Sequence, residues 1–104
     1  MDSAKVDDMI KADPVVMFSK SYCPFCHKAK ALLKMKGVAF KAYELDNMAD
    51  GGSIQSALAA KTKQTTVPNI FIGQKHVGGS DTLAAAEKSG KLNGYLADAG
   101  ISVK

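Results

Sequence analysis

The sequence lacks features that several classes of protein require. Its 104 residues contain no tryptophan and only two cysteines, which is too few for the disulfide framework of a secreted mini-protein. No apolar run approaches the roughly 20 residues that span a bilayer. The polar residues 1–8 contain no apolar segment of the signal-peptide type. We therefore expect no membrane association and a cytoplasmic location, with an organelle after removal of a transit peptide as the open alternative.

The chain also has little net charge. A formal charge of +4 comes from scattered lysines, without an arginine-rich block or a basic run of the kind that binds nucleic acid. This disfavours nucleic acid as a partner and favours small anionic ligands near particular lysines. Hydrophobic residues make up 46% and charged residues 23% of the chain, as in ordinary soluble globular proteins. At this length we expect residues 1–104 to form a single domain with one core.

The two cysteines that are present stand three positions apart, in a C-P-F-C motif at the predicted start of a helix. Helical residues at this spacing are neighbours about 5–6 Å apart, within the Cα separation that a disulfide requires. Pro24 suits the first helical position and places Cys23 at the N-cap, where unpaired N–H groups and the helix dipole favour a thiolate. Cys26 shares a helix side with Ala29 and Leu33, so it should point inward. The pattern predicts an attacking thiol followed by a resolving thiol.

Apolar patterning predicts a chain of alternating helices and strands. The continuous apolar run at residues 14–19 is typical of a strand that is buried on both faces. Helices are expected over residues 3–12 and 24–36, from residue 51, from residue 80 and around residues 92–96, and strands over residues 14–19, 39–45, 66–72 and 75–77.

These elements predict the topology. The first two strands and the helix between them should form a right-handed parallel unit, and the turn Gly73-Gln74 should join the last two strands as a hairpin. Ser80 or Asp81 is expected to cap the next helix, which Gly90 ends. The predicted fold class is α/β: a sandwich with a mixed four-stranded sheet, made of a parallel βαβ unit and an antiparallel hairpin, flanked by helices.

Two metal-based interpretations of the cysteine motif are open at this point. His27 extends it to C-x-x-C-H, the pattern of covalent haem attachment, but the buried-strand runs and Pro24 at the helix start favour a redox site. A zinc site would need four ligands, and Cys23, Cys26, His27 and His76 are an unconvincing set. The histidines are more simply interpreted as a solvated helix residue and a hairpin residue. No metal site is expected.

Three segments together resemble the signatures of the glutaredoxin family. They are F-S-K-S-Y-C-P-F-C at residues 18–26, T-V-P-N-I-F-I-G at residues 66–73 and G-G-S-D at residues 78–81. Their order and spacing resemble that family over nearly the whole chain, and the second cysteine of the motif is retained as in the dithiol class. A thioredoxin would carry a tryptophan before the motif and Gly-Pro between the cysteines, and this chain has neither.

The resemblance implies a thioredoxin-like fold in which Pro68 is cis and lies against the active-site disulfide. It also implies a groove for glutathione, where Lys20 and Gln64 hold the glycine carboxylate and Val67 pairs its backbone with the cysteinyl part. The γ-glutamyl end would lie at the helix start after the paired glycines. The groove residues that the resemblance assigns are Lys20, Tyr22, Phe25, Gln64, Thr66, Val67, Pro68, Gly79, Ser80, Asp81 and Thr82.

Three positions depart from the common pattern of that family. Phe25 stands where tyrosine is commonest, so the ring is kept and a hydroxyl is lost. Thr65 occupies a position that is often arginine, so a cation beside the glycine carboxylate is absent. Ser80 replaces a common cysteine. These departures bear on the affinity for glutathione and leave the type of reaction unchanged.

The resemblance implies a glutathione-dependent thiol–disulfide oxidoreductase with Cys23 as nucleophile and Cys26 as resolving thiol. Its expected substrates are protein–glutathione mixed disulfides and protein disulfides. Glutathione is its co-substrate, and glutathione reductase serves it indirectly through the glutathione pool. We expect a monomer without bound metal. The alternative is a dimer that holds an iron–sulfur cluster between cysteine thiolates and glutathione, which Pro24 disfavours in this family.

Overall fold

The computed structural model of the chain describes residues 2–102 and contains one four-stranded sheet with the order β2-β1-β3-β4. The central strand β1 (Val15–Ser19) pairs in parallel with β2 (Lys41–Glu44) and antiparallel with β3 (Asn69–Ile72). β3 in turn pairs antiparallel with β4 (Lys75–Gly78). The predicted parallel unit joined to a hairpin is therefore confirmed.

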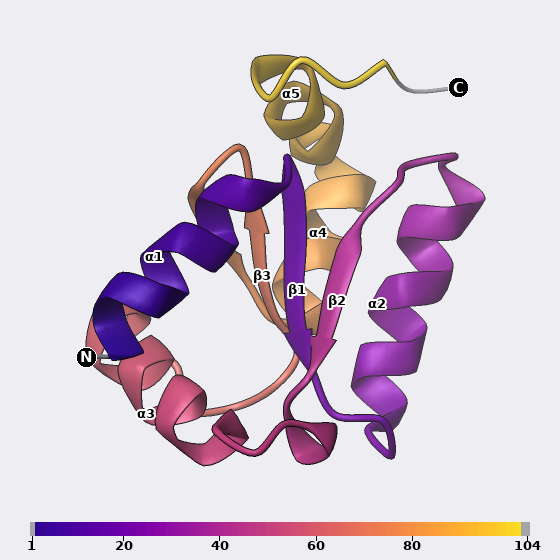
Figure 1. Cartoon of the computed structure of the whole chain (residues 1–104). Coiled ribbons are helices and arrows are strands. Elements are labelled where there is room, and N and C mark those ends of the chain that lie inside the picture. The colour runs from indigo at the N-terminus through magenta and orange to yellow at the C-terminus, as the bar shows by residue number, and fades with distance from the viewer. Residues whose placement is uncertain (1, 103–104) are drawn as a thin grey trace.

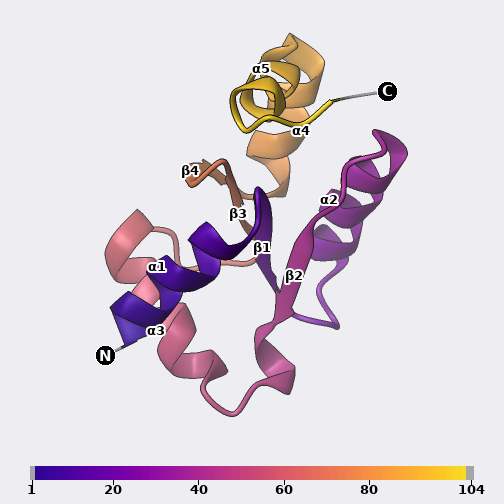
Figure 2. The same cartoon turned by 45° about the horizontal axis from the view of Figure 1, so that its top comes forward.

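Helices cover both faces of this sheet, as Figures 1 and 2 show. α1 and α3 pack together on one face, and α2 and α4 cover the other, with α5 at the end of α4. The helices are α1 (Asp2–Ala12), α2 (Pro24–Met35), the short 3-10 helix η1 (Leu45–Asn47), α3 (Gly51–Thr62), α4 (Ser80–Ser89) and α5 (Lys91–Asp98). None of them, over the residues that the structure describes, is long and apolar enough to cross a bilayer.

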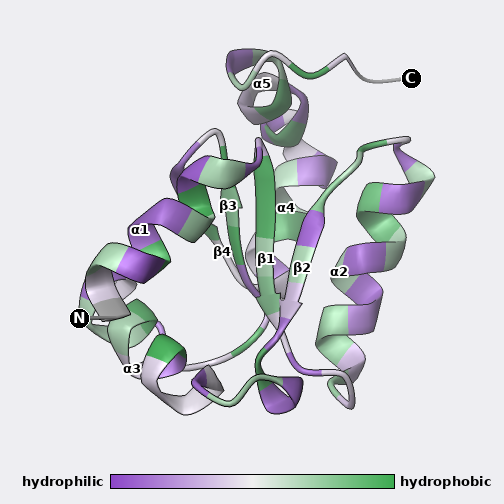
Figure 3. Cartoon of the chain, in the orientation of Figure 1, coloured by the Kyte–Doolittle hydropathy of each residue, from purple (hydrophilic) through white to green (hydrophobic). Residues whose placement is uncertain are grey.

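The core has two parts because successive side chains of β1 point to opposite faces of the sheet. Val15 and Met17 pack in a cluster with residues of α2, α4 and α5, whereas Val16 and Phe18 pack in a cluster with residues of α1 and α3. All four side chains are fully buried, and Figure 3 shows the apolar character of the strand. The strand was predicted to be buried on both faces, and this is confirmed.

The limits of β1 and β4 differ from the expected ones by a single residue, and those of β2 and β3 differ more. β2 begins at Lys41 instead of residue 39 and gives way to η1 after Glu44. β3 begins at Asn69 instead of residue 66, because Thr66 and Val67 form a bend before Pro68, a residue without an N–H to donate to the sheet. Residues 66–68 therefore form a loop at the end of the sheet, and the backbone groups of this loop do not belong to the strand pairing.

The expected cap of α4 is wrong. Ser80 and Asp81 are the first two residues of the helix, and the N-cap is Gly79, which supplies no side-chain hydrogen bond. The preceding Gly78 has φ +121°, and a Cβ there would lie 3.0 Å from the Thr82 hydroxyl. The chain thus turns at the two glycines one residue earlier than expected, which leaves the N–H groups of the first turn without a side-chain cap.

His76 on β4 gives the stability of this fold a pH dependence. Its Nε2 lies 2.9 Å from Oδ1 of Asn69, its ring lies 5.2 Å from that of Phe71, and burial lowers its pKa below the ordinary 6.5. The unfolded chain therefore takes up a proton at higher pH than the folded one, and the free energy of unfolding must fall as pH drops through 6.5.

We expect urea denaturation to show this loss of stability between neutral and mildly acidic pH. His76→Gln removes the titrating ring and keeps an amide that hydrogen-bonds Asn69, so its stability should change much less over the same range. Equal slopes for the wild type and the variant would contradict the assignment to His76.

Candidate active site

The site is built at the first turn of α2. Cys23 is the N-cap, with extended backbone angles of φ −87° and ψ 115°, and Pro24 occupies the start of the helix. The Cys23 sulfur accepts a hydrogen bond from the Cys26 backbone N–H at 3.2 Å. The predicted N-cap position is confirmed, and the sulfur lies where the N–H groups and dipole of the helix stabilise negative charge.

A loop from the other half of the chain closes over the Cys23 sulfur. The Val67 carbonyl oxygen lies 3.8 Å from this sulfur, and the Val67–Pro68 peptide bond is cis, as the family resemblance implied. Pro68 is buried and Cys23 retains 9% of its exposed surface. The sulfur is therefore held between the start of α2 and this loop.

The second thiol, that of Cys26, lies one turn into α2 on the buried side of the helix. Cys26 is fully buried, and both cysteines are free thiols. Burial raises the pKa of the Cys26 thiol, and the neighbouring Cys23 raises it further, whereas the Ser19 hydroxyl and the Lys20 backbone N–H act in the opposite direction. The predicted inward orientation of Cys26 is confirmed. The two thiols differ in access and in surroundings.

A groove of about 440 Å³ lies between the first turn of α2, the loop at residues 64–68 and the start of α4. Cys23 does not line it, but the carbonyl of Val67 on its wall lies 3.8 Å from the Cys23 sulfur. The lining of the groove contains nine of the eleven residues that were predicted to form the glutathione groove. They are Phe25, Gln64, Thr66, Val67, Pro68, Gly79, Ser80, Asp81 and Thr82. The other two do not line it: Tyr22 is 69% exposed on the loop before Cys23, and Lys20 follows β1, where its charge acts on Asp46.

One end of the groove suits the charged end of an amino acid. The start of α4 faces it with N–H groups that no side chain caps, which favours a carboxylate. Asp81 adds a carboxylate in the same first turn, which favours an ammonium group. An α-amino acid carries both charges on one carbon, so this end of the groove fits a free amino-acid terminus.

Gln64 holds the wall of the groove together. Its side-chain amide nitrogen donates to the carbonyl of Thr66 at 3.0 Å and to that of Pro68 at 2.9 Å. An amide NH₂ has two hydrogens, and both are used here. A carboxylate ligand would therefore have to replace one of these bonds. Thr65 lies outside this groove, in a separate hollow beside Gln55.

Sequence reasoning did not find the residues that fix the loop before Cys23. The Ser21 backbone N–H donates to Asp46 Oδ1 at 2.9 Å, and its hydroxyl donates to Oδ2 of the same carboxylate. His27, expected to be merely solvated, lies with Nε2 2.8 Å from the Ser21 carbonyl. The Ser21 hydrogen bonds lower the pKa of Asp46 below 3.8. We call these two Ser21–Asp46 hydrogen bonds the clamp. The clamp persists at neutral pH, because Asp46 stays ionised there, and it is lost only in strong acid.

Within residues 2–102, no three histidine, cysteine, aspartate or glutamate side chains gather closely enough to hold a metal ion.

A C-x-x-C pair at the start of a helix, set against a cis-proline loop on a mixed sheet with helices on both faces, defines a thioredoxin-like thiol–disulfide oxidoreductase.

Comparison with known proteins narrows this class. Residues 15–77 match the family model for glutaredoxin. A glutaredoxin of Solanum lycopersicum is 50% identical over 104 residues, which cover 100% of this chain and 96% of the tomato protein. Glutaredoxin-C1 of Arabidopsis thaliana is 51% identical over 96 residues, which cover 92% of this chain and 77% of that protein.

A solved structure agrees with these sequence matches. The crystal structure of a buckwheat glutaredoxin–glutathione complex superposes with a TM-score of 0.95 at 41% identity, covering 98% of this chain and 94% of the buckwheat chain. The chain belongs to the glutaredoxin family, and its two-cysteine motif is that of the dithiol class. The predicted activity, that of a glutathione-dependent thiol–disulfide oxidoreductase, is confirmed at this level.

We expect Asp46→Asn to loosen the loop before Cys23. Asparagine keeps one oxygen for the Ser21 backbone N–H, but its NH₂ group cannot accept the Ser21 hydroxyl proton. Hydrogen–deuterium exchange at the Ser21 amide should become several-fold faster, and the rate of disulfide reduction should fall several-fold. Asp50→Asn is the matched control, because its carboxylate pairs with Lys5 elsewhere. Unchanged exchange in Asp46→Asn would contradict the clamp.

Proposed function

We propose that this glutaredoxin reduces protein–glutathione mixed disulfides and protein disulfides, with Cys23 as nucleophile and Cys26 as resolving thiol. The observation that carries the proposal is the asymmetry of the two sulfurs. Cys23 sits at the N-cap beside the groove and accepts the Cys26 N–H, whereas Cys26 is fully buried behind it. A substrate disulfide in the groove reaches Cys23 before it reaches Cys26.

The monothiol route uses Cys23 alone. Its thiolate attacks the glutathione sulfur of the mixed disulfide, a Cys23–glutathione disulfide forms, and the protein leaves as a thiolate that takes up a proton. A glutathione thiolate then attacks the glutathione sulfur of this adduct. Oxidised glutathione leaves and Cys23 returns as a thiolate. One free glutathione is consumed, because the other half of the oxidised glutathione comes from the substrate, so the protein–glutathione disulfide is exchanged for glutathione disulfide.

The dithiol route adds Cys26. On a protein disulfide, Cys23 forms a mixed disulfide with the substrate, and the Cys26 thiolate then attacks the Cys23 sulfur. The Cys23–Cys26 disulfide forms and the substrate sulfur leaves as a thiolate, so the two cysteines are oxidised as the substrate is reduced. Glutathione later reduces this disulfide in two exchange steps.

The groove supports glutathione as the second substrate. A related buckwheat glutaredoxin has been solved in complex with glutathione. In this chain the uncapped start of α4 and Asp81 suit the carboxylate and ammonium of the γ-glutamyl end. Val67 presents backbone polar groups beside the Cys23 sulfur, where the cysteinyl part must lie for its sulfur to react.

The proposed partners follow from this chemistry. They are glutathione, glutathionylated proteins and protein disulfides, with glutathione reductase acting through the glutathione pool. We place the protein in the cytoplasm as a monomer. A cysteine pair that glutathione reduces needs a compartment in which the glutathione pool is kept reduced.

Substitution of each cysteine tests the assigned roles. Cys23→Ser should abolish reduction of a glutathionylated peptide, because no other described thiol reaches the groove. Cys26→Ser should keep most of this activity and lose the reduction of protein disulfides. The measurement is NADPH consumption in an assay coupled to glutathione reductase. Activity that survives in Cys23→Ser would overturn the assignment.

Asp81→Asn tests the binding of the γ-glutamyl end. The substitution keeps the shape of the side chain and removes the charge that faces the ammonium group. We expect the KM for a glutathionylated peptide to rise about two- to fivefold, as for the loss of one exposed ion pair, with kcat unchanged. Asp98→Asn, an exposed position at the end of α5, is the matched control. An unchanged KM in Asp81→Asn would place the γ-glutamyl end elsewhere.

A further inference from the structure

Ser19 is a fully buried polar residue that the proposed reaction does not yet use. It ends β1, two positions after Met17 and four after Val15. Alternate residues of a strand point to the same face, so Ser19 faces the side of the sheet that α2 covers. The buried Cys26 lies on that same side, and the Ser19 hydroxyl lowers the pKa of its thiol.

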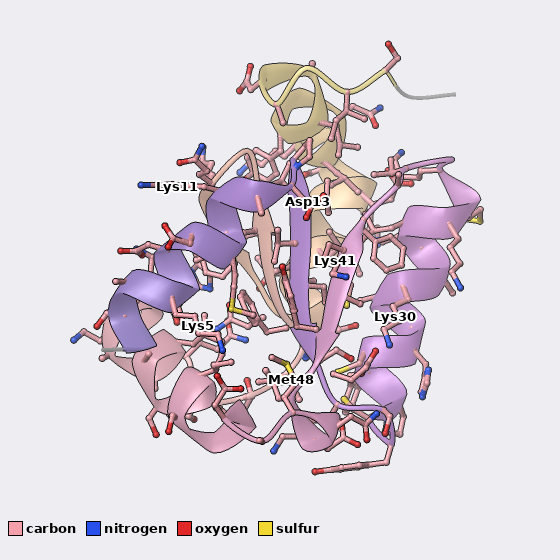
Figure 4. All side chains as sticks on the ribbon, viewed as in Figure 1. Lys5, Lys11, Asp13, Lys30, Lys41 and Met48 are labelled. Atoms are coloured by element: carbon pink, nitrogen blue, oxygen red, sulfur yellow. The ribbon has the colours of Figure 1, made fainter. Side chains whose placement is uncertain are left out.

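Two more side chains meet at this position for reasons of register and helical spacing. Glu44 on β2 is the register partner of Ser19, and the Ser19 hydroxyl donates to Glu44 Oε1 at 2.9 Å. Lys30 stands four residues after Cys26, on the same side of α2, and its Nζ pairs with Glu44 Oε2. Figure 4 shows Lys30 reaching from α2 toward β2. A line of contacts therefore runs from the resolving thiol through Ser19 and Glu44 to Lys30.

The Ser19 hydroxyl has one proton and several acceptors. A serine hydroxyl donates a single hydrogen bond, and here its acceptors are Glu44 Oε1 at 2.9 Å and the Lys20 carbonyl at 3.4 Å. The same hydroxyl lowers the pKa of the Cys26 thiol on its side of the sheet, so an ionised Cys26 sulfur is a third acceptor for it. When Cys26 is a thiol, the hydroxyl donates its hydrogen bond to Glu44 Oε1. When Cys26 is a thiolate, the sulfur competes for it, and Lys30 still neutralises Glu44.

We propose that Ser19 is a positioning residue for the resolving step: its hydroxyl turns from Glu44 to the Cys26 sulfur when Cys26 ionises, and it thereby sets how readily Cys26 attacks a mixed disulfide. The inference rests on the proposed roles of Cys23 and Cys26. In the step concerned, the Cys26 thiolate attacks the Cys23 sulfur, the Cys23–Cys26 bond forms and the substrate leaves as a thiolate. The Cys26 sulfur is then no longer an anion, and the Ser19 hydroxyl donates its hydrogen bond to Glu44 again.

The groups around Cys26 define which charges matter. Cys23 neighbours it on α2. Glu44 on β2 accepts from Ser19, and Lys30 pairs with that carboxylate. Lys20 contributes its backbone N–H, and α4 packs apolar side chains against the same face of the sheet. The competition for the Ser19 proton is therefore between one thiolate and one carboxylate.

The test titrates Cys26 without any turnover. In a Cys23→Ser background, Cys26 is the only thiol left, and the ultraviolet absorbance of its thiolate is followed against pH, with Cys23→Ser/Cys26→Ser as the blank. Adding Ser19→Ala should lower the thiolate fraction at a fixed, slightly alkaline pH by about tenfold or more, the value of one hydrogen bond to a charged group. Adding Glu44→Gln should raise it. Ser56→Ala, an exposed serine on α3, is the matched control and should have no effect.

A double-mutant cycle separates the role of the hydroxyl from the charge of Glu44 acting through space. If Ser19 carries the effect, Glu44→Gln should raise the thiolate fraction much less in a Ser19→Ala background than in its presence. Additive effects, or effects of Ser19→Ala and Glu44→Gln in the same direction, would overturn the proposal.

If Ser19→Ala does not fold, Lys30→Met replaces it. This variant leaves Glu44 unneutralised and should lower the thiolate fraction, and no change would overturn the proposal.

Turnover then distinguishes this inference from the proposed function. In the otherwise wild-type protein, Ser19→Ala should slow formation of the Cys23–Cys26 disulfide, measured by mass spectrometry of the quenched protein, in proportion to its titration. Reduction of a glutathionylated peptide by the monothiol route should be unaffected. Loss of the peptide activity in Cys26→Ser as well as in Cys23→Ser would contradict the proposed function, while the titration of Cys26 would still decide the role of Ser19.

Discussion

The hydrogen bond from the Cys26 backbone N–H to the Cys23 sulfur is the interaction on which the active site depends. It makes Cys23 the N-cap of α2, so its sulfur stays at the end of the helix, 3.8 Å from the carbonyl of Val67 on the groove wall. The same bond places Cys26 one turn further, on the side of the helix that packs on the sheet. A single helical turn therefore makes two chemically identical side chains unequal, because Cys23 keeps 9% of its surface exposed and Cys26 is fully buried. Because the two sulfurs differ in burial, Cys23 attacks the substrate disulfide first and Cys26 attacks the resulting mixed disulfide second.

The opposite wall of the groove is ordered independently of α2. Gln64 bonds the carbonyls of Thr66 and Pro68, and the Thr62 hydroxyl accepts from the Gln64 backbone N–H. Asn69 donates to the same hydroxyl at 3.4 Å and lies within hydrogen-bond distance of His76. These contacts tie the loop to α3 on one side and to the hairpin on the other. A ligand therefore enters a groove whose wall is already fixed, which lowers the entropy that binding must overcome.

The sequence was informative where the signal is local. The start of α2 followed from Cys23 and Pro24, and the position of β1 followed from an apolar run, because capping and burial act over a few residues. The cap of α4 was misplaced because serine and aspartate are good N-cap residues, whereas the backbone turns at Gly78 with φ +121°. The clamp between Ser21 and Asp46 joins residues that lie 25 positions apart. No local pattern reports such a contact.

The surroundings of the resolving thiol show most clearly what the tertiary structure adds. The four-residue spacing of Cys26 and Lys30 is visible in the sequence, but their meeting with Ser19 and Glu44 requires the register of two parallel strands. A slip by one residue would send alternate side chains to opposite faces and bring Tyr43 in place of Glu44. Tyr43 instead stacks on Phe18, with ring centroids 5.5 Å apart, on the face that α1 and α3 cover. The aromatic packing on one side of the sheet thus fixes the register that sets the polar contacts of Cys26 on the other.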